Sequence, residues 1–117
     1  MSSPYHPAAV KQWVEEVCKS DLYPQFIIQI QKDLNRAGMN YSIKSEKPQI
    51  LFSEIANLLL DKLHNDFNEF LNLLYAVDVS ETEIRKLNSE NSTDIAEYAT
   101  YLILKREWQK VWYRNKG

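Results

Sequence analysis

The sequence PQILFSEIANLLLDKLHNDFNEFLNLLY, residues 48–75, contains the longest amphipathic repeat of the chain. Apolar residues recur in it every three to four positions, and polar residues form the opposite stripe with the same period. This spacing predicts one continuous α-helix of roughly 28 residues, about 40 Å long. We expect this helix to span the domain, with the other helices packed along it. Its apolar stripe consists of Phe52, Ile55, Leu59, Leu63, Phe67, Phe70 and Leu74.

The composition of the whole chain favours a helical fold as well. A length of 117 residues fits one domain, and a content of 44% hydrophobic and 26% charged residues excludes extensive disorder. Two glycines and four prolines are too few for the tight turns of a β-sandwich or barrel, and two glycines cannot form a glycine-rich phosphate-binding loop. The sequence therefore predicts an all-α fold: a single-domain helical bundle of four or five helices around one long central helix.

Two further helices precede the predicted central helix. The first covers residues 7–19, where apolar residues repeat at helical spacing. The second covers residues 21–37, and Gly38 suits the left-handed residue that ends a helix. We expect residues 1–6 to form a loose N-terminal arm and residues 39–47 to form an extended loop, because a single short strand would have no partner.

The chain after residue 79 contains two signals for the start of a helix. Ser80-Glu81-Thr82-Glu83 is a capping box, in which the serine hydroxyl accepts a hydrogen bond from the N–H of the second glutamate and that glutamate reaches back to the serine. A short helix over residues 81–88 is predicted to follow it. A second box-like start at Asp94 predicts a last helix that ends near residue 113, so that residues 114–117 fray.

Apolar residues lie on two faces of the last helix. Those in its first half share one side: Ile95, Tyr98, Ala99, Leu102 and Ile103. Those in its second half lie roughly opposite: Tyr101, Leu104, Trp108, Val111 and Trp112. Such a helix lies either between two layers of its own domain or with its second face against another chain. Because few helices are available to cover it, we favour the second arrangement.

Basic residues are concentrated at the C-terminal end of the chain. Residues 105–117 contain five basic residues and one acidic residue, Glu107, although the whole chain has a net charge of −2. The body of the protein is therefore acidic, and its end is basic and aromatic. The candidate interface or polyanion-binding residues are Tyr101, Lys105, Arg106, Trp108, Lys110, Trp112 and Arg114.

This basic, aromatic segment is compatible with four roles. Tryptophan, tyrosine and arginine dominate the energetics of protein interfaces. Lysine and arginine also bind nucleic-acid phosphates while aromatic rings stack on bases, but the acidic body would repel a polyanion. Basic helices that contain tryptophan bind anionic membrane surfaces. In the fourth role, the segment packs on the acidic surface of its own domain and binds no partner.

Residues capable of catalysis or metal binding do not form a recognisable site in the sequence. Asp61 and His64 are one helical turn apart, but a di-metal helical bundle needs two such pairs and further carboxylates, and the other histidine, His6, lies in the N-terminal arm. Cys18 falls on an apolar helix face, which does not favour a reactive thiolate. We therefore expect no enzymatic activity, cofactor or metal, and leave open whether Asp61 and His64 have a role.

The sequence contains no recognisable signal for export or membrane insertion. Its N-terminal residues lack the basic and apolar segments of a signal peptide. The most apolar stretch, residues 50–60, is too short and too polar to span a bilayer. A single cysteine cannot form an intramolecular disulfide. We therefore expect a cytoplasmic protein.

Three segments carry a resemblance to known sequences: IIQIQKDL (residues 27–34), LNLLYAVDVSETE (residues 71–83) and ILKREWQK (residues 103–110). In these segments the chain resembles a group of short, uncharacterised helical bacterial proteins. It departs from their pattern at Ala76, where a basic residue is expected. The resemblance implies a small, free-standing intracellular helical protein, and it implies no activity.

These observations lead to one functional hypothesis and one alternative. We expect a non-enzymatic protein-interaction module that self-associates, as a homodimer, through the second apolar face of the last helix. The alternative is a nucleic-acid-binding protein that uses the basic, aromatic last helix. A membrane surface is the least favoured partner.

Overall fold

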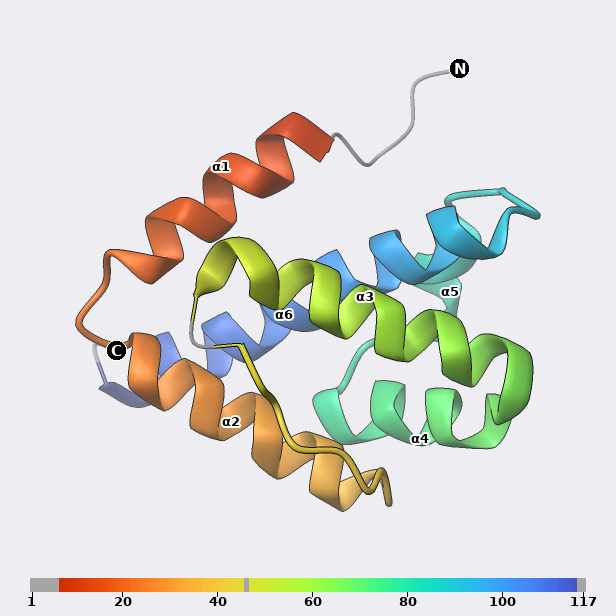
Figure 1. Ribbon diagram of the computed structural model, residues 1–117, viewed down its shortest axis with the longest axis horizontal. Helices are drawn as coiled ribbons and strands as arrows, with labels where there is room; N and C mark the ends of the chain where they lie inside the picture. The colour runs from red at the N-terminus through yellow and green to blue at the C-terminus, as the bar shows by residue number, and fades with distance from the viewer. Residues whose placement is uncertain (1–6, 46, 116–117) are drawn as a thin grey trace.

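The computed structural model describes residues 7–45 and 47–115 of the chain. Over these residues the fold is all-α and contains no strand, which confirms the predicted fold class. In the described part of the chain, no helix is long and apolar enough to cross a lipid bilayer. The helices, shown in Figure 1, are α1 (Pro7–Cys18), α2 (Tyr23–Arg36), α3 (Pro48–Asn65), α4 (Phe67–Val77), α5 (Glu81–Arg85) and α6 (Ser92–Asn115).

The prediction of one helix over residues 48–75 is wrong, because the chain turns back at Asp66, between α3 and α4. Asp66 leaves the helical conformation (φ −156°, ψ 75°), and its side chain accepts a hydrogen bond from the N–H of Glu69 at 3.2 Å. This N-cap starts α4 in a new direction, so α3 and α4 lie side by side and antiparallel (Figure 1). Leu59 and Leu74, on either side of the break, are both completely buried.

The central helix of the domain is α6. The helix α3 packs along it, and α2, α4 and α5 contact other parts of it (Figure 1). Ile103, Leu104 and Val111 are almost completely buried. The helix therefore lies between layers of its own domain, and the expectation that its second apolar face meets another chain is wrong for Leu104 and Val111. Trp112, at the end of that face, stays 45% exposed.

Local sequence signals identified several helix ends. The helices α1 and α2 occupy nearly the predicted ranges, and Gly38 adopts the left-handed conformation with φ +84°. Ser80 caps α5, but its hydroxyl accepts a hydrogen bond from the N–H of Thr82 at 3.1 Å rather than from that of Glu83. The Glu83 carboxylate pairs with Lys86 at 2.8 Å instead of reaching back to Ser80. The predicted capping box is therefore reduced to a one-sided cap.

Both ends of the last helix differ from the prediction. The Asn91 side chain accepts a hydrogen bond from the N–H of Asp94 at 3.1 Å, so α6 begins earlier, at Ser92. At the other end the helix continues to Asn115, so Arg114 is helical rather than frayed.

The segment between α2 and α3 has no helix or strand over residues 39–45, as the sequence predicts. Glu54 of α3 accepts hydrogen bonds from two backbone N–H groups of this loop, at 2.8 and 2.9 Å, and so fixes it against the helix. The predicted N-terminal arm, residues 1–6, lies outside the described residues, as do residues 116–117.

Candidate interaction surface

The seven residues predicted as an interface or polyanion site lie on one helix but not on one face. Glu107 is completely buried and marks the inward face in the C-terminal half of α6. The candidate residues form two stripes along the helix, one on each side of this inward face. The aromatic stripe consists of Tyr101, Lys105, Trp108 and Trp112, and the basic stripe consists of Arg106, Lys110 and Arg114. The two stripes contact different neighbouring residues.

The aromatic stripe leads from the core of the domain to its surface. Trp13 of α1 meets the Tyr101 ring edge-on, with 6.1 Å between the ring centroids. Phe26 of α2 meets Trp108 in the same way at 5.6 Å, and the Trp108 and Trp112 rings lie 6.3 Å apart. Because Phe26 is buried, Trp108 is anchored on the core, and Trp112 extends the row of rings to solvent.

A shallow hollow of about 270 Å³ lies at the exposed end of this stripe. It is lined by Trp108, Gln109, Trp112 and Tyr113, and we call it the aromatic hollow. Tyr113, which the sequence analysis did not select, is 69% exposed at its rim. The hollow is smaller than the usual binding site of a drug-sized ligand. Its size and apolar lining suit a single apolar side chain of another protein.

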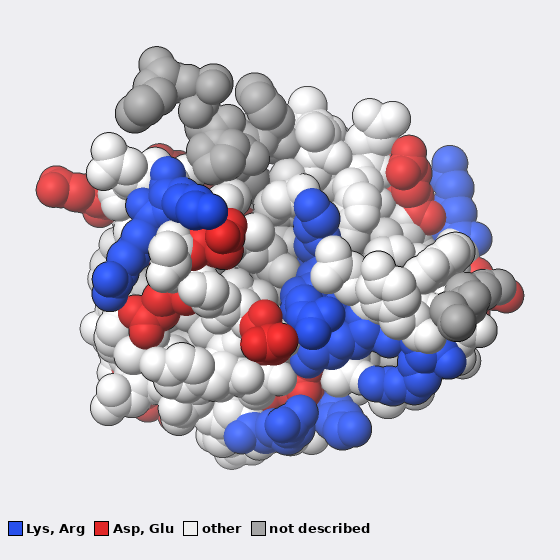
Figure 2. All heavy atoms as spheres, turned by 180° about the vertical axis from the view of Figure 1, so that it is seen from behind, with Lys and Arg blue, Asp and Glu red and all other residues white. Residues whose placement is uncertain are grey.

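The basic stripe reaches toward α2 and the end of α4. Arg106 Nη2 pairs with Asp78 Oδ2 at 3.2 Å, directly after α4. Arg114 Nη2 donates to Gln29 Oε1 of α2 at 2.9 Å. Figure 2 shows that Lys and Arg side chains gather on the face of the molecule opposite that of Figure 1. The structure therefore supports the sequence-based view of α6 as a source of positive charge.

The third cation of the stripe, Lys110, binds two carboxyl groups inside the domain. Its Nζ lies 2.8 Å from Asp33 Oδ2 and 3.2 Å from Glu107 Oε1, and both acidic side chains are 0% exposed. Gln29 Nε2 also donates to Asp33 Oδ2 at 3.1 Å. Arg36 Nη1 lies 3.2 Å from Asp33 Oδ1. Arg36, which the sequence analysis did not select, therefore lies beside the basic stripe. We call Asp33 and Glu107 the buried carboxyl pair.

The buried carboxyl pair holds one proton at neutral pH. Burial, together with the adjacent Asp33 carboxylate, raises the pKa of Glu107 to about 9. Burial also acts to raise the pKa of Asp33, but hydrogen bonds from Glu107, Lys110 and Gln29 outweigh it and lower that pKa. Among the described residues, none donates a well-aligned hydrogen bond to either oxygen of Glu107. The raised pKa favours a neutral Glu107, which avoids a second buried negative charge beside Asp33.

The sequence analysis missed this pair, although both positions carried a signal. Asp33 has the same helical phase as the core residues Phe26 and Ile30, and Glu107 has that of Ile103. An acidic residue in the core phase of a helix indicates a buried polar contact. That the two helices are neighbours, however, follows only from the tertiary structure.

Comparison with known proteins adds no further identification. No known protein family, curated protein or solved structure matches this chain. The candidate site is therefore defined by its own geometry.

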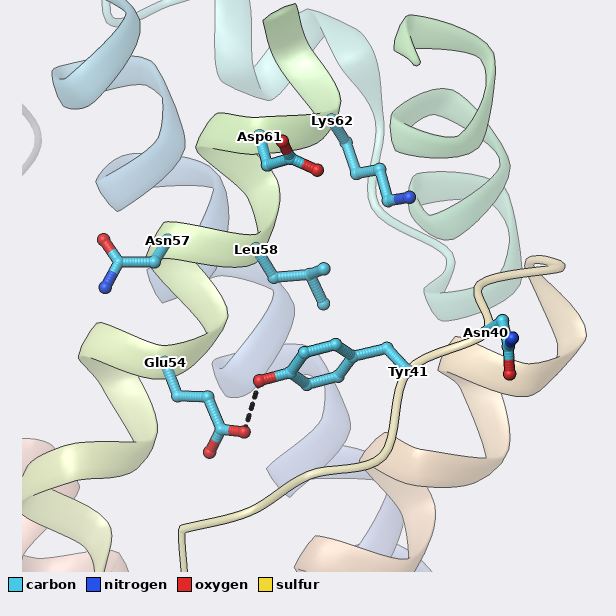
Figure 3. Close-up of a pocket in the computed structure, with 7 residues that line it drawn as sticks. All are labelled: Asn40, Tyr41, Glu54, Asn57, Leu58, Asp61 and Lys62. Atoms are coloured by element: carbon cyan, nitrogen blue, oxygen red, sulfur yellow. Dashed lines mark hydrogen bonds between the residues drawn. The ribbon is translucent and has the colours of Figure 1, made fainter. Parts of the chain in front are cut away.

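A second hollow, of about 420 Å³, lies between α3 and the loop of residues 39–45 (Figure 3). Tyr41 points across it and donates to Glu54 Oε2 at 2.5 Å. Burial opposes the ionisation of Glu54, but hydrogen bonds from Ser45, Tyr41 and Lys44 lower its pKa to about 2. Burial and the Glu54 carboxylate raise the pKa of Tyr41 to about 12. These groups hold the loop on α3, so we assign them a structural role.

The residues considered for metal binding or nucleophilic chemistry have local contacts. Asp61 is exposed and accepts a hydrogen bond from Asn65 at 2.7 Å, and His64 is also exposed. Cys18 Sγ donates to the backbone carbonyl of Glu15 at 3.1 Å. Within residues 7–45 and 47–115, no three His, Cys, Asp or Glu side chains are arranged to hold a metal ion.

Proposed function

We propose that the protein is a non-enzymatic binding module that docks another protein on the aromatic hollow. The observation that carries this proposal is the exposure of two consecutive aromatic residues, Trp112 at 45% and Tyr113 at 69%, at the rim of an apolar depression. Tryptophan and tyrosine are enriched in protein interfaces and contribute much of their binding energy. Trp108, anchored on Phe26, gives the hollow a fixed floor and so limits the entropy lost on binding.

The position of the buried carboxyl pair supports a non-enzymatic role. Acidic groups with strongly shifted pKa values often mark active sites. Asp33 and Glu107 are such groups, but both are 0% exposed, so a substrate does not reach them in this fold. Their partner Lys110 is held by Asp33 and by the backbone carbonyl of Ala76. The pair and its lysine therefore serve the contact between α2, α4 and α6.

The proposal is tested by placing a photo-crosslinking amino acid at Tyr113, in the cells that produce the protein naturally. Tyr75 of α4 is the matched control, because it is the same residue type and is 67% exposed. We expect a discrete protein adduct from position 113 and none from position 75. The absence of an adduct at position 113, or the same adducts from both positions, would contradict the proposal.

The sequence predicts self-association through the second apolar face of the last helix, of which the aromatic hollow contains Trp108 and Trp112. A homodimer would give an adduct of twice the chain mass from position 113. Analytical ultracentrifugation at tens of micromolar protein provides an independent check, and a monomer at that concentration would exclude self-association.

The second candidate function is nucleic-acid binding, favoured by the gathering of Lys and Arg side chains seen in Figure 2. It would use Lys105, Arg106, Lys110 and Arg114, with Arg36 of α2 beside them. Against it, Lys110 is only 18% exposed and is already paired with a buried acid. This function predicts binding that weakens steeply as salt increases. No mobility shift of single-stranded RNA or DNA at low salt would exclude it.

A further inference from the structure

We infer that the aromatic hollow receives an apolar side chain from an acidic segment of a different protein. This inference deepens the proposed function and depends on it. It concerns the chemistry of the partner, which the charges around the hollow specify.

Basic residues lie along one edge of the aromatic hollow and at its N-terminal end on α6. On one side, Arg106 and Lys110 precede Tyr113 by seven and three residues, which places all three along one edge of α6. At the N-terminal end of the hollow, Lys105 lies one to two turns before Gln109 and Trp112 on the aromatic stripe, and its Nζ is 5.6 Å from the centroid of the Tyr101 ring. An extended or helical segment that places one apolar side chain in the hollow therefore lies close to basic residues along one edge of the hollow and at its N-terminal end.

The acidic residues next to this surface do not cancel its charge. Glu107 is completely buried and lies against Lys110 and Asp33, so it presents no carboxylate at the surface of α6. Asp33 is buried beneath Lys110 and Arg36, two cations for one carboxylate. Asp78 pairs with Arg106, but its side chain is 80% exposed, and such exposed pairs are weak and easily exchanged for another carboxylate. The surface is therefore positive on a protein whose net charge is negative.

Charge also decides between a different protein and a second copy of this chain. A symmetric dimer would place the same surface patch of both copies in one interface. Lys105, Arg106 and Arg114 of both copies would then be gathered in that interface, and like charges across an interface oppose association. An acidic partner meets the same residues with attraction.

The test uses the photo-crosslinker at position 113 in two charge-reversed backgrounds. Lys105→Glu with Arg106→Glu removes positive charge from the rim of the hollow. Arg85→Glu with Lys86→Glu is the matched control at the C-terminal end of α5, where both side chains are exposed and the change in net charge is identical. We expect the first background to lower the adduct yield at least about tenfold and the second to change it less than about twofold. Thermal unfolding of both variants confirms that they are folded.

Each outcome has a distinct meaning. An adduct whose crosslinked peptide is net acidic, and whose yield falls only in the Lys105/Arg106 background, supports the inference. An adduct that tolerates the Lys105→Glu and Arg106→Glu changes, a net basic crosslinked peptide, an adduct of twice the chain mass, or an adduct lost after nuclease treatment overturns it. These results leave protein binding at the hollow standing, except for the nuclease-sensitive adduct, which favours the nucleic-acid function. The absence of any adduct at position 113 is the failure of the proposed function itself.

Discussion

Glu107 of the buried carboxyl pair and the aromatic hollow lie on the same C-terminal half of α6, but only the hollow is exposed to solvent. At Glu107 the helix carries an acid with a pKa of about 9 that is sealed against Asp33 of α2. Little more than one turn later, Trp112 and Tyr113 are exposed, although their side chains would gain from burial. The carboxyl groups with shifted pKa values are enclosed by the fold, whereas the aromatic side chains of the hollow are open to solvent. This contrast is the basis of our proposal of binding rather than catalysis.

The largest expected effect comes from breaking the buried region. Asp33→Ala removes the carboxylate that Lys110, Gln29 and Arg36 share, and leaves the largely buried Lys110 with only Glu107 and the Ala76 carbonyl as partners. We expect a loss of about 3–5 kcal/mol in the free energy of unfolding. Asp78→Asn removes the charge of an exposed partner of Arg106, keeps a residue that tolerates the left-handed backbone of this position (φ 74°), and should cost less than about 1 kcal/mol. Urea denaturation of both variants measures the difference. Equal losses would show that Asp33 does not have the structural role described here.

The next largest effect is a difference in stability between alanine substitutions of Trp108 and Trp112, the inner and outer tryptophans of the aromatic stripe. Trp108 packs on the buried Phe26 ring, so Trp108→Ala should lower the free energy of unfolding by about 2–3 kcal/mol. Trp112 is 45% exposed, so Trp112→Ala should cost less than about 1 kcal/mol. Denaturant unfolding of the two variants under the same conditions gives this ranking. The reverse ranking would mean that Trp112, rather than Trp108, is the ring anchored on the core.

The pH dependence of stability is graded, and per pH unit it is smaller than the two effects above. The pKa of Glu107 is raised from an ordinary value of 4.5 to about 9, so the folded protein binds a proton that the unfolded chain releases. Stability is therefore greatest below about pH 4.5 for this group and falls as the pH rises toward 9, by at most about 1.4 kcal/mol per pH unit. Glu107→Gln, which keeps a neutral side chain, should remove this slope.

The slope is measured by urea denaturation of the wild type and the Glu107→Gln variant between pH 6 and pH 9. The variant should become the more stable of the two as the pH rises. Parallel curves would mean that Glu107 is ionised in the folded protein, with Lys110 and Arg36 supplying the compensating charge.

The sequence predicted those parts of the fold that depend on local signals. Gly38 and Ser80 identified the end of α2 and the start of α5, because each acts within one turn. Asp66 carried the same kind of signal, an N-cap residue three positions before Glu69, but the apolar period runs through it without interruption. A period alone does not distinguish one long helix from two helices that pack back on each other.

The candidate surface was predictable only in part, for the same reason. The aromatic and basic character of the last helix is visible in the sequence, and Trp112 and Arg114 are exposed as an interface requires. The helices α3 and α2 determine which apolar face of α6 is covered. The burial of Leu104 and Val111 therefore could not be predicted from the sequence of α6 alone. Pairs that join distant segments, such as Asp33 with Lys110, depend on tertiary contacts in the same way.

The assignment of the aromatic hollow as the docking surface is tested most directly by the ratio of photo-crosslinking yields at Tyr113 and Tyr75 in the native cell. The two tyrosines are almost equally exposed, at 69% and 67%, so exposure alone gives a ratio near one. The account predicts a ratio far above one, with one defined protein attached at position 113. A ratio near one would contradict the assignment of the end of α6 as the docking surface.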